Sequence, residues 1–174
     1  MTDKIESVLL EEAIKEVETA ITRIALLHLS FSKVLVDEFG DERGSELVIK
    51  SIMEYGRRIN EVVSKGGDDL PKWGVYSGGV YQDGDGNYHV TGCNLAKVFK
   101  QFNELNLGCL YCYVDAAKSM DSDPMKKLIH TSCEACGDDH CTLQFVDTTE
   151  EERNSFINRD TKLKYVDPRL SRSF

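Results

Sequence analysis

Five of the six cysteines lie between positions 107 and 145, and their spacing is typical of metal ligation. Two C-x-x-C pairs are separated by twenty residues, and a fifth cysteine follows the second pair five positions later. Four thiolates hold zinc tetrahedrally at about 2.3 Å, and pairs with this spacing commonly supply them. The ligands predicted from the sequence are Cys109, Cys112, Cys133, Cys136 and Cys141.

The kind of metal site depends on how many of these thiols converge. Four thiolates would make a closed, structural zinc site, whereas three protein ligands and a water would activate hydroxide near neutral pH. An iron–sulfur cluster uses the same ligands and is the less favoured cofactor. Reduced structural cysteines without any metal remain the third interpretation.

The same stretch also offers a nucleophilic set. Asp115 follows Cys112 by three residues, which places both on one face of a helix, and His130 lies on the next predicted strand. A histidine can take the proton of a thiol while a carboxylate orients the imidazole. Cys112, Asp115 and His130 are therefore the predicted catalytic residues.

Two residues outside this stretch are candidates for substrate binding. Arg57 lies mid-helix, where its guanidinium could reach a substrate carboxylate or be an ordinary solvated charge. Cys93 lies at a predicted junction between a strand and a helix, where a thiol is either exposed to the helix dipole or buried and structural.

Composition limits the compartment and the partners. The 174 residues suffice for one sizeable core, and the net charge of −9 with a pI near 4.9 argues against nucleic acid or an anionic membrane as partner. The N-terminus lacks a secretory signal, and we find no apolar run approaching eighteen residues. We expect a cytoplasmic protein with reduced thiols. Its expected partner is a small-molecule ligand or substrate, and the sequence leaves both a monomer and a homo-oligomer open.

The first third of the chain predicts two antiparallel helices. Apolar residues recur at helical spacing from Ile5 to Gly40, in one helix or in two with a break near residues 28–30, and Asp3 with Glu6 resembles a capping box. His28 on the apolar face is interpreted as a core residue. A second helix is expected over 41–65, and the short connection makes the pair antiparallel.

The rest of the chain predicts strands around the cysteines. After a linker at 68–72, segments 73–81 and 87–91 flank an Asp-Gly-Asp-Gly turn, which lacks the glutamate of a calcium loop, and a helix follows over 93–103. The next elements expected are a helix over 109–119 and strands over 127–133 and 141–146. A capped helix from 148 to 158 follows, and the chain ends in an extended tail that could dock on a partner. These elements predict one α+β domain over 1–174, in which the helices pack on an antiparallel sheet with a Cys-rich C-terminal hairpin. The domain consists of a helical pair at 1–66, a site-bearing part at 72–147, and a short helix and tail at 148–174.

Three motifs resemble the L-2-amino-thiazoline-4-carboxylic acid hydrolase family. They are LGCLYCYVDAA from Leu107, His130-Thr131, and GDDHCTLQF from Gly137, and a looser likeness extends over residues 26–146. The resemblance implies hydrolysis of a small cyclic C–N bond. It matches Cys93, Cys112, Asp115, Thr131, Gly137, Asp138 and Cys141, and adds Thr131 to Cys93 and Arg57 as substrate-binding residues.

The departures from that family point to a second resemblance. His130 stands where the family commonly has arginine and Asn94 where it has proline, while Cys109, Cys133 and Cys136 are additional thiols. The hairpin resembles vinyl-reductase-type small-molecule-binding domains, in which a helix cysteine and a C-x-x-C-G-D-x-x-C-like hairpin hold zinc. The two expected functions are thus a hydrolase of a cyclic amidine-like or thiazoline-like substrate, and a non-catalytic binding domain with structural zinc.

Overall fold

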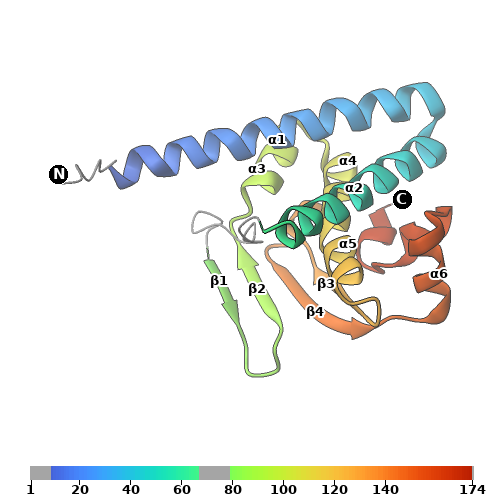
Figure 1. The fold of residues 1–174 in the computed structure, drawn as a ribbon. Coiled ribbons are helices and arrows are strands. Elements are labelled where there is room, and N and C mark those ends of the chain that lie inside the picture. The colour runs from blue at the N-terminus through green and yellow to red at the C-terminus, as the bar shows by residue number, and fades with distance from the viewer. Residues whose placement is uncertain (1–8, 67–78, 174) are drawn as a thin grey trace.

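A computed structural model describes residues 9–66 and 79–173, and these begin with two long antiparallel helices (Figure 1). Helix α1 spans Leu10–Phe39 without a break, and α2 spans Asp41–Ser64. Only Gly40 joins them, and its φ of +79° is accessible to glycine at little cost. Gly44 lets the helices approach closely, because an added Cβ would lie 2.5 Å from Val36 Cα. The predicted capping box at Asp3 lies outside the described residues.

The four described strands form one antiparallel sheet in the order β1-β2-β4-β3. The strands are β1 (Gly79–Gln82), β2 (Tyr88–Thr91), β3 (Lys126–Ser132) and β4 (Cys141–Asp147). Asp83 accepts hydrogen bonds from the backbone of Asp85 and Asn87, which confirms the turn between β1 and β2. The predicted linker at 68–72 and the first part of the strand at 73–81 lie outside the described residues.

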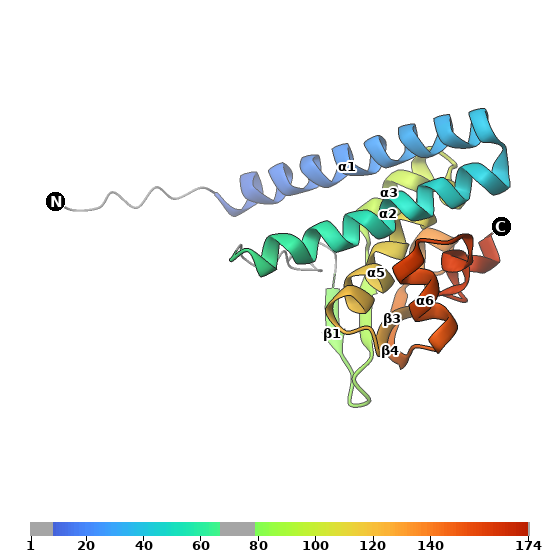
Figure 2. The ribbon, with the colours of Figure 1, turned by 45° about the vertical axis from the view of Figure 1, so that its right-hand side comes forward.

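Helices connect the two hairpins and cover one face of the sheet. Helix α3 (Asn94–Gln101) leads to α4 (Leu105–Gly108), a 3-10 turn (Cys109–Cys112) and α5 (Tyr113–Ser122). Helix α5 packs between α2 and strand β3 (Figure 2). The approach of α2 to α5 is close at Gly56, where an added Cβ would lie 2.5 Å from the Ala117 Cβ.

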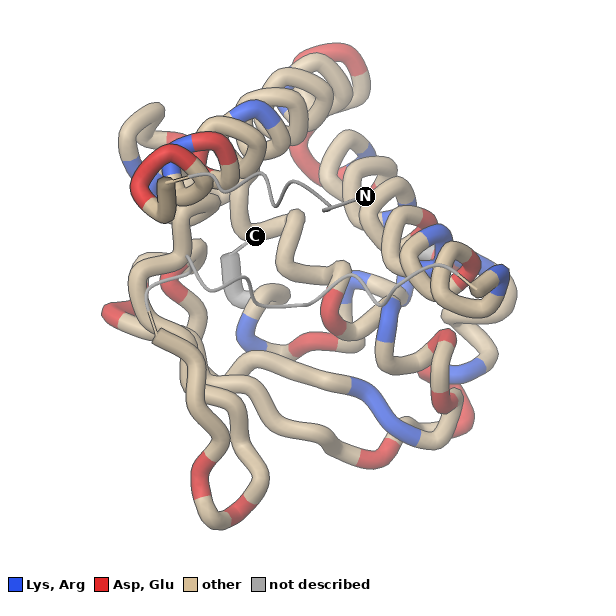
Figure 3. Tube along the Cα trace, turned by 60° about the vertical axis from the view of Figure 1, so that its left-hand side comes forward, with Lys and Arg blue, Asp and Glu red and all other residues tan. Residues whose placement is uncertain are grey.

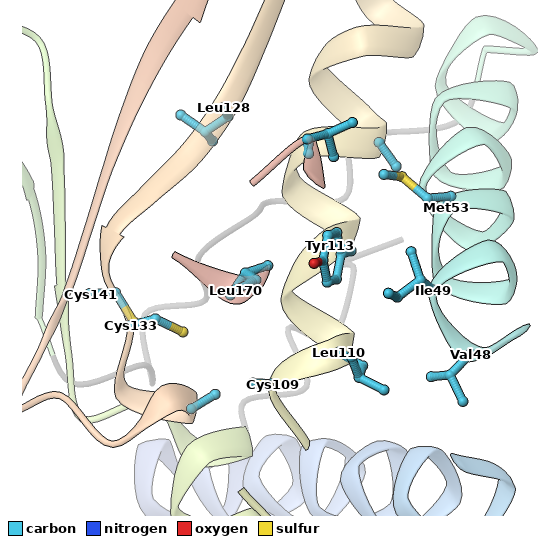
Figure 4. Packing of buried hydrophobic residues seen from close by; sticks show 14 of the residues in the cluster. Val48, Ile49, Met53, Cys109, Leu110, Tyr113, Leu128, Cys133, Cys141 and Leu170 are labelled. Atoms are coloured by element: carbon cyan, nitrogen blue, oxygen red, sulfur yellow. The ribbon is translucent and has the colours of Figure 1, made fainter. Parts of the chain in front are cut away.

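The C-terminal tail differs from the expectation of an extended segment. Helix α6 (Glu150–Asn158) confirms the predicted capped helix, and its cap is a capping box between Thr149 and Glu152. Two 3-10 turns (Thr161–Tyr165 and Leu170–Ser173) then fold back onto the body. Leu163, Val166 and Leu170 are buried, and Figure 4 draws Leu170 between the β3–β4 hairpin and α5. The prediction was wrong because these apolar residues complete the core of the domain.

The predicted fold class is confirmed: a helix pair, an antiparallel sheet and a Cys-rich hairpin form an α+β structure. Helix α1 is also long and apolar enough to cross a membrane by length and composition, contrary to our expectation from the sequence. This is weak evidence, because a core helix of a soluble protein has the same features. The cytoplasmic location stays a prediction.

Candidate metal and catalytic centre

Three side chains from different elements converge beneath the helix layer. Cys112 ends the 3-10 turn before α5, His130 lies on β3, and Cys133 directly follows that strand. Their ligating atoms all lie within 4.8 Å of one another. The sulfurs of Cys112 and Cys133 are 3.8 Å apart. Two thiolates on a tetrahedral zinc at 2.3 Å would be about 3.8 Å apart, so this pair already has the spacing of metal ligands.

The chain directs these side chains through an irregularity in β3 and a tight turn after it. The register with β4 shifts between His130 and Ser132, and the chain then turns through the 3-10 segment Glu134–Cys136. Gly137 closes the turn with a φ of +93°. The backbone N–H of Cys133 donates to Asp138 Oδ2 at 2.7 Å, which fixes the start of the turn. A regular strand would continue along β4 and carry Cys133 away from the helix.

Cys133 lies at the centre of a larger group of sulfurs. Its thiol donates to the sulfur of Cys112 at 3.8 Å, and interactions with the sulfurs of Cys112, Cys136 and Cys141, followed by burial, raise the pKa of Cys133. The interaction with Cys133 lowers the pKa of Cys141, whose sulfur also accepts the Glu134 backbone N–H at 3.2 Å. Figure 4 draws Cys133 and Cys141 side by side on the hairpin. A fourth ligand can therefore come from this hairpin.

Of the five predicted metal ligands, Cys109 is the one that the structure turns elsewhere. It is fully buried in the 3-10 turn, and its thiol donates to the carbonyl of Asn106 at 3.1 Å. Cys109 and Cys112 are the first and last residues of this 3-10 turn, and of the two only Cys112 belongs to the converging group with His130 and Cys133. In the part of the chain that the structure describes, all six thiols are free of disulfides.

Asp167 orients His130, and no sequence pattern had selected it as a site residue. The backbone N–H and the Nδ1–H of His130 donate to Asp167 Oδ2 at 2.9 and 2.8 Å. Asp167 is completely buried and also accepts the backbone N–H groups of Arg169 and Leu170. It lies in the tail that we expected to be extended. The apolar Val166 and Leu170 on either side of it were the available signal that this segment is buried.

The predicted triad therefore needs a correction in the role of Asp115. Its Oδ2 lies 3.7 Å from His130 Nε2, beyond a normal hydrogen bond and on the opposite side of the ring from Asp167. Burial lowers the pKa of His130. The hydrogen bond to Asp167 and the charges of Cys112, Asp167 and Asp115 outweigh burial and raise this pKa to about 10. Asp167 is thus the carboxylate that orients the imidazole, and Asp115 faces its other nitrogen, Nε2.

The three predicted substrate-binding residues lie in three different environments: beside other cysteines, on the exposed side of a strand, and at a contact between two helices. Cys93 is close enough to Cys112 and Cys141 to interact with them electrostatically, and burial raises its pKa to about 12, so it is a protonated thiol rather than an exposed, activated one. Thr131 is exposed on β3 and donates to the carbonyl of Thr142. Arg57 lies at the α2–α6 contact, where its guanidinium stacks 3.9 Å from the ring centroid of Phe156.

This arrangement defines an α+β protein whose Cys/His/Cys group, buried at His130 and Cys133 and partly buried at Cys112, could hold a metal ion. Comparisons with protein families, with curated proteins and with solved structures find no match to this chain. Both family resemblances stay expectations, and the functional argument rests on the geometry of the site.

Proposed function

We propose that this protein holds a zinc ion through Cys112, His130 and Cys133 and hydrolyses a C–N bond of a small cyclic substrate. The observation that carries the proposal is the convergence of the two sulfurs and the imidazole within 4.8 Å. The carboxylate of Asp167 behind the imidazole supports it, because metal-binding histidines usually donate their second N–H to such a partner. With Nδ1 held by Asp167, a metal would bind at Nε2 and displace the proton that the raised pKa of His130 keeps there.

Two sulfurs and one nitrogen suit zinc better than calcium or magnesium, which prefer oxygen ligands. Three protein ligands leave one position for water, and zinc in such a site lowers the pKa of that water to about 7. An amidine-like carbon in a small ring is an electrophile that hydroxide can attack. This matches the substrate class implied by the resemblance to the thiazoline hydrolases.

Asp115 supplies the proton transfers that this reaction needs. Hydrolysis removes a proton from the attacking water and adds one to the leaving nitrogen, and one carboxylate can do both in turn. Asp115 is mostly buried, and its Oδ2 lies 3.7 Å from His130 Nε2, which places its carboxylate beside the proposed ligands. Cys112 in this proposal is a ligand rather than a nucleophile.

A second candidate function is favoured by the other sulfurs around Cys133. If Cys112, Cys133, Cys136 and Cys141 together hold zinc, the site is closed and structural, and the protein binds a small molecule without converting it. The contacts of the Cys133 thiol with the three other sulfurs support this alternative. The two proposals share Cys112 and Cys133 and differ in whether His130 or the hairpin cysteines complete the ligand set.

Zinc content and affinity of single variants separate the two candidates. The hydrolase proposal expects His130→Ala to lose zinc and Cys136→Ser to retain it, whereas the binding-domain proposal expects the reverse. Cys133→Ser should lose zinc in both cases and serves as the common control. Asp115→Asn should retain zinc but abolish ring opening of an aminothiazoline carboxylate, followed by loss of ring absorbance. A wild-type protein purified with zinc in the medium but without bound metal would refute both.

A further inference from the structure

Helix α1 has two apolar faces, and the body of the protein covers one of them. Ala25, Leu29 and Ser32 on the inner face are buried against the rest of the domain. A helix that is apolar on a second side as well is normally covered on that side too. The second face is formed by eight apolar residues, all of them exposed or only partly buried: Leu10, Ala13, Val17, Ala20, Ile24, Leu27, Phe31 and Val34.

The spacing of this outer stripe is a heptad repeat. Its residues alternate steps of three and four along 25 residues, so they occupy the a and d positions of successive heptads. An ordinary surface helix follows a period of 3.6, and a strict period of 3.5 sustained over more than three heptads is typical of a coiled-coil seam. Three of the four flanking g positions carry charge: Glu16, Arg23 and Asp37. The stripe therefore has the pattern of a helix that packs against another helix.

The exposed area is large enough for a stable pair. Five large members of the stripe remain 43–67% exposed: Leu10, Ile24, Leu27, Phe31 and Val34. Together they leave on the order of 500 Å² of apolar surface in water, which is near the upper end for a monomeric protein. Two copies meeting along this face would bury roughly 1,000 Å² from these side chains alone, the size at which specific interfaces begin.

Charge favours a second protein helix over a lipid surface as the occupant. Interfacial membrane helices carry lysine and arginine on the polar face. The N-terminal end of α1 is acidic instead, with Glu11 and Glu12 in its first turn, as the red segment at that end in Figure 3 shows. Crossing a membrane would also require the inner face, with buried His28 and Ser32, to leave the body.

We propose that two copies of this chain form a symmetric dimer by packing their α1 helices together along the outer stripe. A twofold axis makes such a contact self-complementary, because the same residues meet from both sides. This stripe lies on a different side of α1 from Ala25, Leu29 and Ser32, which contact the body, so the dimer leaves the Cys/His group and its metal binding unchanged.

The test is the mass of the full-length protein in solution, measured by light scattering over about 1 to 100 µM protein, because a dimer dissociates on dilution. We expect wild type to have twice the 19.6 kDa of one chain. Combining Leu27→Glu with Phe31→Glu places charges in the seam and should weaken the dimer by about 100-fold. Leu26→Glu is the matched control, because Leu26 is exposed on the same helix but off the stripe, and it should leave the dimer intact.

Circular dichroism and zinc content establish that each variant is folded. If the double variant does not fold, Phe31→Ala introduces no charge and should still weaken the dimer by about tenfold. A wild-type monomer at the highest concentration overturns the proposal, and so does a Leu26→Glu variant that dissociates as readily as the stripe variants. Monomeric wild type that sediments with neutral lipid vesicles would identify the stripe as a membrane contact instead.

Discussion

Replacing Asp167 with asparagine tests whether this buried carboxylate prepares His130 for a metal. The carboxylate accepts four hydrogen bonds, two from His130 at Oδ2 and two from Arg169 and Leu170 at Oδ1. Asparagine keeps the shape but offers one acceptor and one donor in place of two acceptors. If its oxygen keeps the Arg169 and Leu170 contacts, its NH₂ group faces the backbone N–H of His130, donor against donor.

The substitution also changes the imidazole itself. A neutral His130 would accept the new N–H at Nδ1, and its own proton would move to Nε2, the nitrogen that the zinc needs. Losing an outer-shell partner of a histidine ligand typically lowers metal affinity 10–100-fold, which we expect here. The unsatisfied backbone N–H and the lost charge pair should destabilise the fold by about 2–4 kcal/mol.

Zinc affinity is measured by competition with a chromophoric chelator, and stability by urea denaturation of the chelator-treated protein. Asp160→Asn is the matched control: Asp160 caps the preceding 3-10 turn through Lys162 N–H, and asparagine caps equally well, so both properties should change little. If Asp167→Asn binds zinc within about threefold of wild type while His130→Ala does not, Asp167 has no role in preparing the ligand.

Two further predictions concern the scaffold. Gly56→Ala should lower the free energy of unfolding by about 1–3 kcal/mol in urea denaturation, because its Cβ would meet the Ala117 Cβ at 2.5 Å. Gly84→Ala is the control, because nothing lies within 4 Å of the added Cβ, and it should leave the free energy of unfolding unchanged. Equal losses of stability in the two variants would contradict the close α2–α5 packing. Burial lowers the pKa of His28 below 6.5 despite its hydrogen bond to the Leu107 carbonyl, so the unfolded state binds its proton first and stability falls as the pH drops below 6.5. His28→Gln should lose the fall in stability that protonation of His28 causes below pH 6.5. If the free energy of unfolding changes with pH equally steeply in wild type and variant, His28 is not the cause.

Local patterns predicted most of the elements because each has a local cause. Helical periodicity fixed α1 and α2, the Thr149 and Glu152 capping box marked the start of α6, and an Asp-Gly-Asp-Gly turn marked the first hairpin. The prediction of an extended tail was wrong because short 3-10 turns show no hydrophobic periodicity in the sequence. Their conformation depends on Leu163, Val166 and Leu170 filling the core, which is a tertiary effect.

The sequence predicted that cysteine, histidine and aspartate form the site, but it did not predict all of the residues that do so. Cysteine spacing selected Cys112 and Cys133 as metal ligands, whereas His130 was predicted only as a catalytic residue. Spacing also treated Cys109 and Cys112 as equivalent, although the Cys109 thiol donates to the carbonyl of Asn106. Asp167 stands 37 residues after His130, and no local pattern links two residues that far apart. The likeness to known families did not help here, since it matched Asp115 and left Asp167 unmarked.

The position of Asp167 also explains why the C-terminal turns and the site form one unit. Arg169, two residues on, pairs with both oxygens of Asp138 at 2.9 Å, and Asp138 in turn accepts the backbone N–H of Cys133. One short segment therefore holds His130 from one side and the Cys133 turn from the other. Two of the three converging side chains therefore depend on residues 167–169 for their orientation, and the Cys/His/Cys group keeps this geometry only while that segment is packed against the hairpin.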